Sequence, residues 1–145
     1  MKNITKVIVF TLCILLCLSS CTFVNKLKDE AAKVAEFSKD FVGLVEEPTV
    51  ENAEKLLHPS SPLTPEVVVE KIKNNEKLKD IDFSKDMEVT LGEISDVTLI
   101  RQDPDLGGAV YGTECSIIVN GQTIVVSLTM LSTSDGMGIY DFDIK

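Results

Sequence analysis

The chain has 145 residues and a formal net charge of −9, with 14 basic against 23 acidic side chains. This length fits one domain of ordinary size and is too short for two. The acidic balance excludes nucleic acid as an expected partner, because phosphate binding depends on clustered Lys and Arg side chains.

The first residues have the layout of an export signal. Lys2 and Lys6 precede an apolar run over residues 7–18, and Leu18-Ser19-Ser20-Cys21 closes the segment. A positive start, a short apolar run and small closing residues are typical of such signals, and this run is shorter than the roughly 20 apolar residues that cross a bilayer. Residues 18–21 resemble the lipobox of bacterial lipoproteins. The resemblance implies a signal peptide over residues 1–20, lipidation of Cys21 as the new N-terminus, and a short tether over residues 21–25.

The lipobox also sets the expected location and cysteine chemistry. It implies a lipid anchor in the cell envelope outside the cytoplasm, and Thr22, in place of the Asp that retains such proteins at the inner membrane, favours an outer membrane. Cys13 and Cys17 leave with the signal, so Cys115 is the remaining free thiol and no internal disulfide is predicted. Loss of the two signal lysines lowers the 14 basic side chains to 12, and against 23 acidic ones the net charge is −11.

Three helices are predicted in the first half of the domain. From Lys26 to Val45, apolar residues recur at spacings of three and four, which is typical of an amphipathic helix that ends before Pro48. A shorter helix over residues 50–57 has Thr49 as its N-cap, and a third begins with Thr64 as cap and Pro65 at its first position. The predicted buried residues of these helices are Leu27, Ala31, Val34, Phe37, Phe41, Leu44, Ala53, Leu56, Leu57, Val68, Val69 and Ile72.

The second half is predicted to be sheet. Residues 87–91 alternate apolar and polar side chains, and residues 96–100 form a second β-rich run. Asn120-Gly121 between two β-rich runs predicts a type I′ hairpin, which pairs Val119 with Gln122 and continues to Tyr111 with Met130. In the last strand, the side chains expected to face inward are those of Tyr140, Phe142 and Ile144.

This order defines an α+β fold, with N-terminal helices packed on one face of a curled four-stranded antiparallel sheet. A long first helix, a short helix ending in Leu56-Leu57-His58-Pro59 and a closing meander resemble the cystatin-like superfold, over residues 26–145 as a single domain. Within it, the chain is similar to nuclear-transport-factor-2-like lipoproteins of uncharacterised function. The resemblance implies a cone-shaped hollow between the first helix and the sheet, which related proteins use for ligands, for dimers or for catalysis.

No residue pattern predicts a catalytic centre or a cofactor. His58 is the only histidine, and its place at a helix end favours contact with the last carbonyls and the helix dipole over proton transfer. Cys115 faces inward beside Val126, as a small buried hydrophobe does. One His and one free Cys cannot close a zinc site, and the turn at residues 103–107 is too short for calcium. Whether Glu93, Ser95 or Asp96 faces the hollow is left open, because a bulge at Gly92 would reverse the facing.

Two groups of strand residues are candidate surfaces. The first faces inward and either lines the hollow or fills the core, with the core favoured; it comprises Tyr111, Thr113, Leu128 and Met130. The second is apolar on the outer sheet face, where a protein partner or a homodimer could bind; it comprises Ile118, Val125 and Leu131.

These observations favour a membrane-anchored extracytoplasmic lipoprotein that acts as a non-enzymatic binding or accessory module. One alternative is a small-molecule enzyme or carrier that uses the hollow, and another is a structural component of the envelope that binds a basic partner. Two ionisable side chains within hydrogen-bond reach of each other inside the hollow would favour the enzyme.

Overall fold

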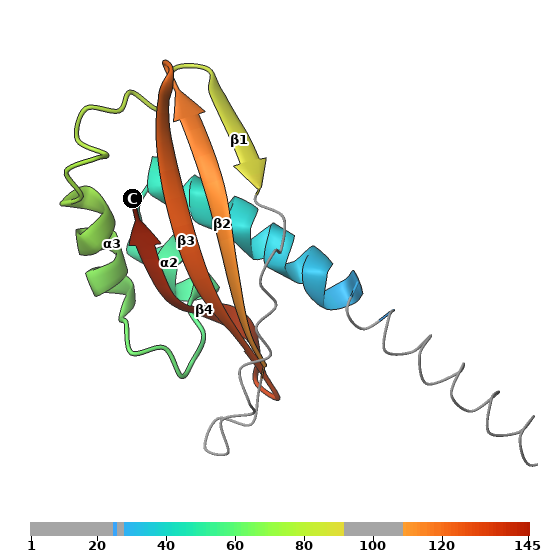
Figure 1. Cartoon of the computed structure of the whole chain (residues 1–145). Helices are drawn as coiled ribbons and strands as arrows, with labels where there is room; N and C mark the ends of the chain where they lie inside the picture. Colours follow the sequence, from blue (N-terminus) through green and yellow to red (C-terminus); the bar gives the residue numbers. More distant parts are fainter. Residues whose placement is uncertain (1–24, 26–27, 92–108) are drawn as a thin grey trace, which may run out of the picture. The chain divides into compact units, whose positions relative to one another are not determined.

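The computed structural model describes residue 25, residues 28–91 and residues 109–145 (Figure 1). Residues 1–32 and 33–145 form separate compact units. In the first unit the described residues, 25 and 28–32, are helical. In the second unit the first helix covers residues 33–46. In the described ranges, no helix is both long and apolar enough to cross a membrane.

The second unit has the predicted α+β fold, with the sheet order β1-β2-β3-β4 and antiparallel pairing throughout. The sheet is open, so β1 and β4 are its edges. The elements after the first helix are α2 (Val50–Leu56), α3 (Pro65–Lys73), β1 (Met87–Leu91), β2 (Ala109–Val119), β3 (Gln122–Thr133) and β4 (Gly136–Ile144) (Figure 1).

Both predicted helix starts are confirmed. The side chain of Thr49 accepts a hydrogen bond from the backbone N–H of Asn52 at 3.3 Å, and Thr64 accepts one from Val67 at 3.4 Å. Pro65 opens α3, where its missing N–H costs nothing because the first N–H groups of a helix have no intrahelical acceptor. These caps fix where α2 and α3 leave the loops.

The hairpin between β2 and β3 is confirmed in turn type and in register. Asn120 and Gly121 have φ angles of 50° and 75°, and positive φ at both central residues is what a type I′ turn requires. The pairing runs without a shift from Val119 with Gln122 to Ala109 with Ser132.

One predicted facing in β4 is wrong. The register against β3 shifts between Thr129, which pairs with Asp141, and Met130, which pairs with Ile139. Tyr140 is therefore the extra residue of a β-bulge, and Ile139 takes the inward place with 1% of its surface exposed. After the bulge, side chains again alternate between the two faces of the sheet. The predicted inward facing of Phe142 and Ile144 is confirmed, since both are buried.

The core lies between the helices and one face of the sheet. Phe142 of β4 packs on Phe41 of the first helix, with ring centroids 4.9 Å apart and the rings tilted at 55°. Lys71 of α3 lies over the same Phe142 ring, 4.4 Å from its centroid. Phe142 thus joins a strand to two helices.

The outer edge of β4 is covered by the chain after α2. Leu57 forms a parallel bridge with Ile139, and the backbone passes so close that a Cβ on Gly138 would lie 2.5 Å from the nitrogen of His58. Three carbonyls of this edge accept hydrogen bonds from outside the sheet: Ile139 from the His58 N–H at 3.0 Å, Tyr140 from Ser61 Oγ at 2.8 Å, and Phe142 from Lys71 Nζ at 2.7 Å. These three donors are called the β4 clamp below.

Candidate binding groove

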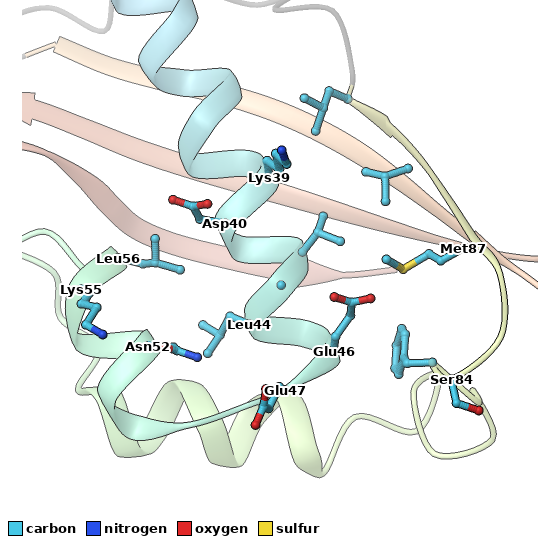
Figure 2. A pocket seen from close by; sticks show the side chains of 15 residues that line it. Lys39, Asp40, Leu44, Glu46, Glu47, Asn52, Lys55, Leu56, Ser84 and Met87 are labelled. Carbon is cyan, nitrogen blue, oxygen red and sulfur yellow. The ribbon is translucent and has the colours of Figure 1, made fainter.

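A groove of about 1170 Å³ opens between the first helix, α2 and β1 (Figure 2). Its lining comes from residues 39–47 of the first helix, from α2, from residues 83–84 and from β1. In Figure 2 the first helix lies between α2 on one side and Met87 and Ser84 on the other. The groove residues are Lys39, Asp40, Val42, Gly43, Leu44, Glu46, Glu47, Asn52, Lys55, Leu56, Phe83, Ser84, Met87, Val89 and Leu91.

The deep part of the groove is apolar. Val42, Leu44 and Leu56 are buried residues of the core, so the floor of the groove is the edge of the core itself. On β1, side chains alternate between the two faces of the sheet, which places Met87, Val89 and Leu91 on the groove side. Leu91 keeps 38% of its surface exposed, although burial of its side chain would be favourable.

Gly43 leaves part of the helix wall without a side chain. A Cβ built at this position would have no atom within 4 Å, so it would point into open space of the groove. Gly in the interior of a helix is less favourable than Ala by about 1 kcal/mol. The helix therefore carries a small cost at the position where its backbone borders the groove.

The rim of the groove is charged and exposed. Figure 2 shows Lys39 and Asp40 along the first helix, with Glu46 and Glu47 further on, at its C-terminal end. The last carbonyls of a helix carry negative partial charge, which adds to the charge of two adjacent carboxylates. This end of the groove, defined by Glu46 and Glu47, is called the acidic end below.

Lys55 on the opposite rim has a partner of its own. Its Nζ donates a hydrogen bond to Glu51 at 2.7 Å, one helical turn earlier on α2. The hydrogen bond from Lys55, and then its positive charge, lower the pKa of the Glu51 carboxyl. Lys55 is therefore paired with a carboxylate of its own helix, and the pair adds no net positive charge near the acidic end.

Among the described residues that line the groove, no ionisable side chain is buried. The charged residues of the groove are all exposed to solvent, and its buried residues are all apolar. In the part of the chain that the structure describes, no group of three or more His, Cys, Asp and Glu side chains could hold a metal ion. The geometry suits the binding of an apolar body with its polar ends at the rim.

The strand residues predicted to line the hollow or fill the core are in the core. Tyr111, Thr113, Leu128 and Met130 are all buried, and none of them lines the groove. A space between the first helix and the sheet does exist, but the strand that lines it is β1 and not the hairpin of β2 and β3. The signal that could have located it is Gly43, an isolated glycine within a helical pattern.

The predicted outer surface is only partly present. Ile118 and Val125 are half-buried on the face away from the core cluster, but Leu131 has 2% of its surface exposed and offers no contact area. Its predicted exposure is wrong. Alternation along a strand gives the face on which a side chain lies, and it does not tell whether that face is covered.

His58 and Cys115 are buried and have structural partners. His58 Nδ1 accepts a hydrogen bond from the Ser60 N–H at 3.0 Å, and Nε2 lies 2.9 Å from Thr133 Oγ1, so the neutral ring with its hydrogen on Nε2 fits both. The expected contact with the end of α2 is therefore wrong: the ring bonds to the loop and to β3. Cys115 has 1% of its surface exposed, which confirms its predicted inward place. Burial raises the pKa of its thiol to about 11, and its Sγ donates to the carbonyl oxygen of Val126 at 3.7 Å.

Several predictions fall on residues outside the described ranges. They concern lipidation of Cys21, the β-rich run over residues 96–100, the turn at residues 103–107 and the facing of Glu93, Ser95 and Asp96.

The fold and the groove define an α+β domain with an open, partly apolar groove. Comparison of the chain with known protein families, with curated proteins and with solved structures finds no match.

Proposed function

We propose that the chain is a lipoprotein, anchored through lipid on Cys21 in the cell envelope outside the cytoplasm, whose cystatin-like domain binds a ligand without transforming it. The signal-like residues 1–20 and the sequence Leu18-Ser19-Ser20-Cys21 support the anchor. The outer membrane is the proposed location, on the strength of Thr22 after the anchor residue.

The observation that supports binding is the apolar groove with its exposed charged rim. An enzyme of acid–base type needs ionisable groups held against the reacting atoms, where burial and neighbours tune their pKa. The described groove residues bring apolar side chains to the interior and leave the charges in water. This distribution favours a binding module over the alternative of a small-molecule enzyme.

Replacement of Cys21 tests the anchor. In protein extracted from cells, mass spectrometry is expected to find Cys21 at the N-terminus with diacylglycerol on its sulfur and a fatty acyl group on its amine, and a palmitate label should be incorporated. Cys21→Ser should lose the label and the membrane association, because the sulfur of Cys21 is the atom to which the diacylglycerol is attached. Cys17→Ser, four residues earlier, is the matched control and should keep both. Wild-type protein that begins at Met1, or whose Cys21 carries a free thiol, would refute the anchor.

An environment-sensitive fluorophore at position 43 tests the groove. Gly43→Cys can be labelled selectively in the lipidated chain, because Cys115 is buried and its thiol is protonated. In vesicles of phosphatidylcholine, the label is expected to emit at shorter wavelength than the same label on Glu36→Cys, an exposed position of the same helix outside the groove. Equal emission from the two positions would mean that no apolar body enters the groove.

A further inference from the structure

The two edge strands of the sheet, β1 and β4, differ in how their outer backbone groups are hydrogen-bonded, although both are long enough to pair with another strand. The β4 clamp occupies three carbonyls of one edge with donors from the chain after α2 and from α3. Such coverage is a common protection, because an uncovered edge offers a row of backbone N–H and C=O groups to any passing strand. Among the described residues, no donor from outside the sheet hydrogen-bonds to the opposite edge, β1.

Among the described residues, β1 pairs with β2 alone. Its side chains on one face, Met87, Val89 and Leu91, line the groove, while Glu88 and Thr90 are exposed. A peptide that extended the sheet beyond β1 would form backbone hydrogen bonds with this edge, and every second side chain would point to the groove side of the sheet. The groove therefore lies where the side chains of an added strand would go.

The size of the groove agrees with a peptide. Its volume of about 1170 Å³ exceeds the roughly 300–1,000 Å³ of sites for small molecules. β1 has five residues, and an extended peptide of the same length spans about 17 Å at roughly 3.4 Å per residue. The open space at Gly43, where a Cβ would have no neighbour within 4 Å, gives room for a side chain of that peptide against the helix.

The charge of the rim selects among peptides. Glu46 and Glu47 form the acidic end, at the C-terminus of the first helix, and Figure 2 shows Glu46 on the side of the groove that faces Ser84. A Lys or Arg side chain would be attracted there, whereas an acidic one would be repelled. On the opposite rim, Lys55 is already paired with Glu51.

We propose that the β1 edge and the groove together bind an extended, apolar peptide segment of a partner protein that carries a basic side chain, added to the sheet as a further strand. This inference rests on the proposed binding role of the groove and names the class of its ligand.

The probe is a fluorescein-labelled peptide, Lys-Thr-Val-Thr-Val-Thr-Lys, whose Lys and Val side chains share one face of an extended strand. The full lipidated chain is held in phosphatidylcholine vesicles. We expect fluorescence anisotropy to show binding that is about tenfold tighter than that of the same peptide with Glu in place of both Lys, since the acidic end attracts the Lys side chains and repels the Glu side chains. The double variant Glu46→Lys/Glu47→Lys should reverse this preference. The matched control Glu54→Lys/Glu66→Lys, with the same change of charge at exposed positions outside the groove, should keep it.

A second probe separates strand addition from simple charge attraction. The Lys peptide with N-methyl groups on alternate residues keeps its side chains and loses the N–H donors of one edge, so it should lose most of its affinity. Equal affinity for the methylated peptide, or equal affinity for the Lys and Glu peptides, would overturn the proposal. So would a chain that is dimeric in detergent and does not bind the peptide, because β1 would then pair with a second copy. If the fluorophore on Gly43→Cys is nevertheless shielded, the groove still stands as a binding site and only the peptide assignment fails.

Discussion

Gly138→Ala is expected to lower the free energy of unfolding by about 1–3 kcal/mol, the range for overpacking of a well-packed site. A Cβ at this position would lie 2.5 Å from the nitrogen and 2.6 Å from the Cα of His58. Both are backbone atoms, so no side-chain rotation relieves the clash. That backbone is also held in place, because the His58 N–H donates to the carbonyl of Ile139 at 3.0 Å. Urea unfolding of the full chain, followed by circular dichroism, measures the loss.

Gly43→Ala is the matched control for this prediction. Its Cβ would meet no atom within 4 Å, and Ala is the better helix former, so a gain of about 0.5–1 kcal/mol is expected. The same substitution should thus have opposite effects at two glycines of one domain. A Gly138→Ala variant as stable as the wild type would show that the chain after α2 can move away from β4 without cost.

Phe142→Ala is expected to cost about 3–5 kcal/mol of stability, the usual range for a buried aromatic side chain. The ring is buried and contacts Phe41 of the first helix at a centroid distance of 4.9 Å. Its loss leaves a cavity where a strand and two helices meet, and the surrounding backbone can collapse only in part. Thermal and urea unfolding of the full chain should both report the change.

Lys71→Ala measures the contribution of the cation that lies over the Phe142 ring, apart from that of the ring itself. Lys71 lies 4.4 Å from the Phe142 centroid and 3.7 Å from Asp141, but 43% of its side chain is exposed. The exposed ion pair contributes little, but the variant also loses the hydrogen bond from Lys71 Nζ to the Phe142 carbonyl at 2.7 Å, so a loss of about 1–2 kcal/mol is expected. If Phe142→Ala cost no more than Lys71→Ala, the ring would not be an anchor of the core.

Local rules account for the parts of the fold that could be predicted from the sequence. The hairpin register follows from Asn120-Gly121 together with the period of two in the flanking strands, since a slip by one residue would turn every apolar side chain to the other face. The starts of α2 and α3 follow from Thr49 and Thr64, whose side chains replace missing backbone acceptors. Each of these features depends on residues that are close in sequence.

The features that escaped prediction depend on contacts between distant segments. The bulge at Tyr140 exists where β4 meets the chain after α2, and no local pattern around Tyr140 indicates it. The burial of Leu131 likewise depends on what lies over the outer face. The groove needs the first helix beside β1, about forty residues later in the chain, so its lining could not be read from either segment alone.

The unequal edges of the sheet also limit how far the protein can assemble. A filament of the cross-β kind needs each subunit to accept a strand on both sides, so that growth can continue in two directions. The β4 clamp occupies one edge, and in the part of the chain that the structure describes β1 is the edge that keeps one side without a paired strand. Edge-to-edge association through β1 would therefore end at a pair of subunits, because the clamped edge of each subunit gives a further strand no place to add.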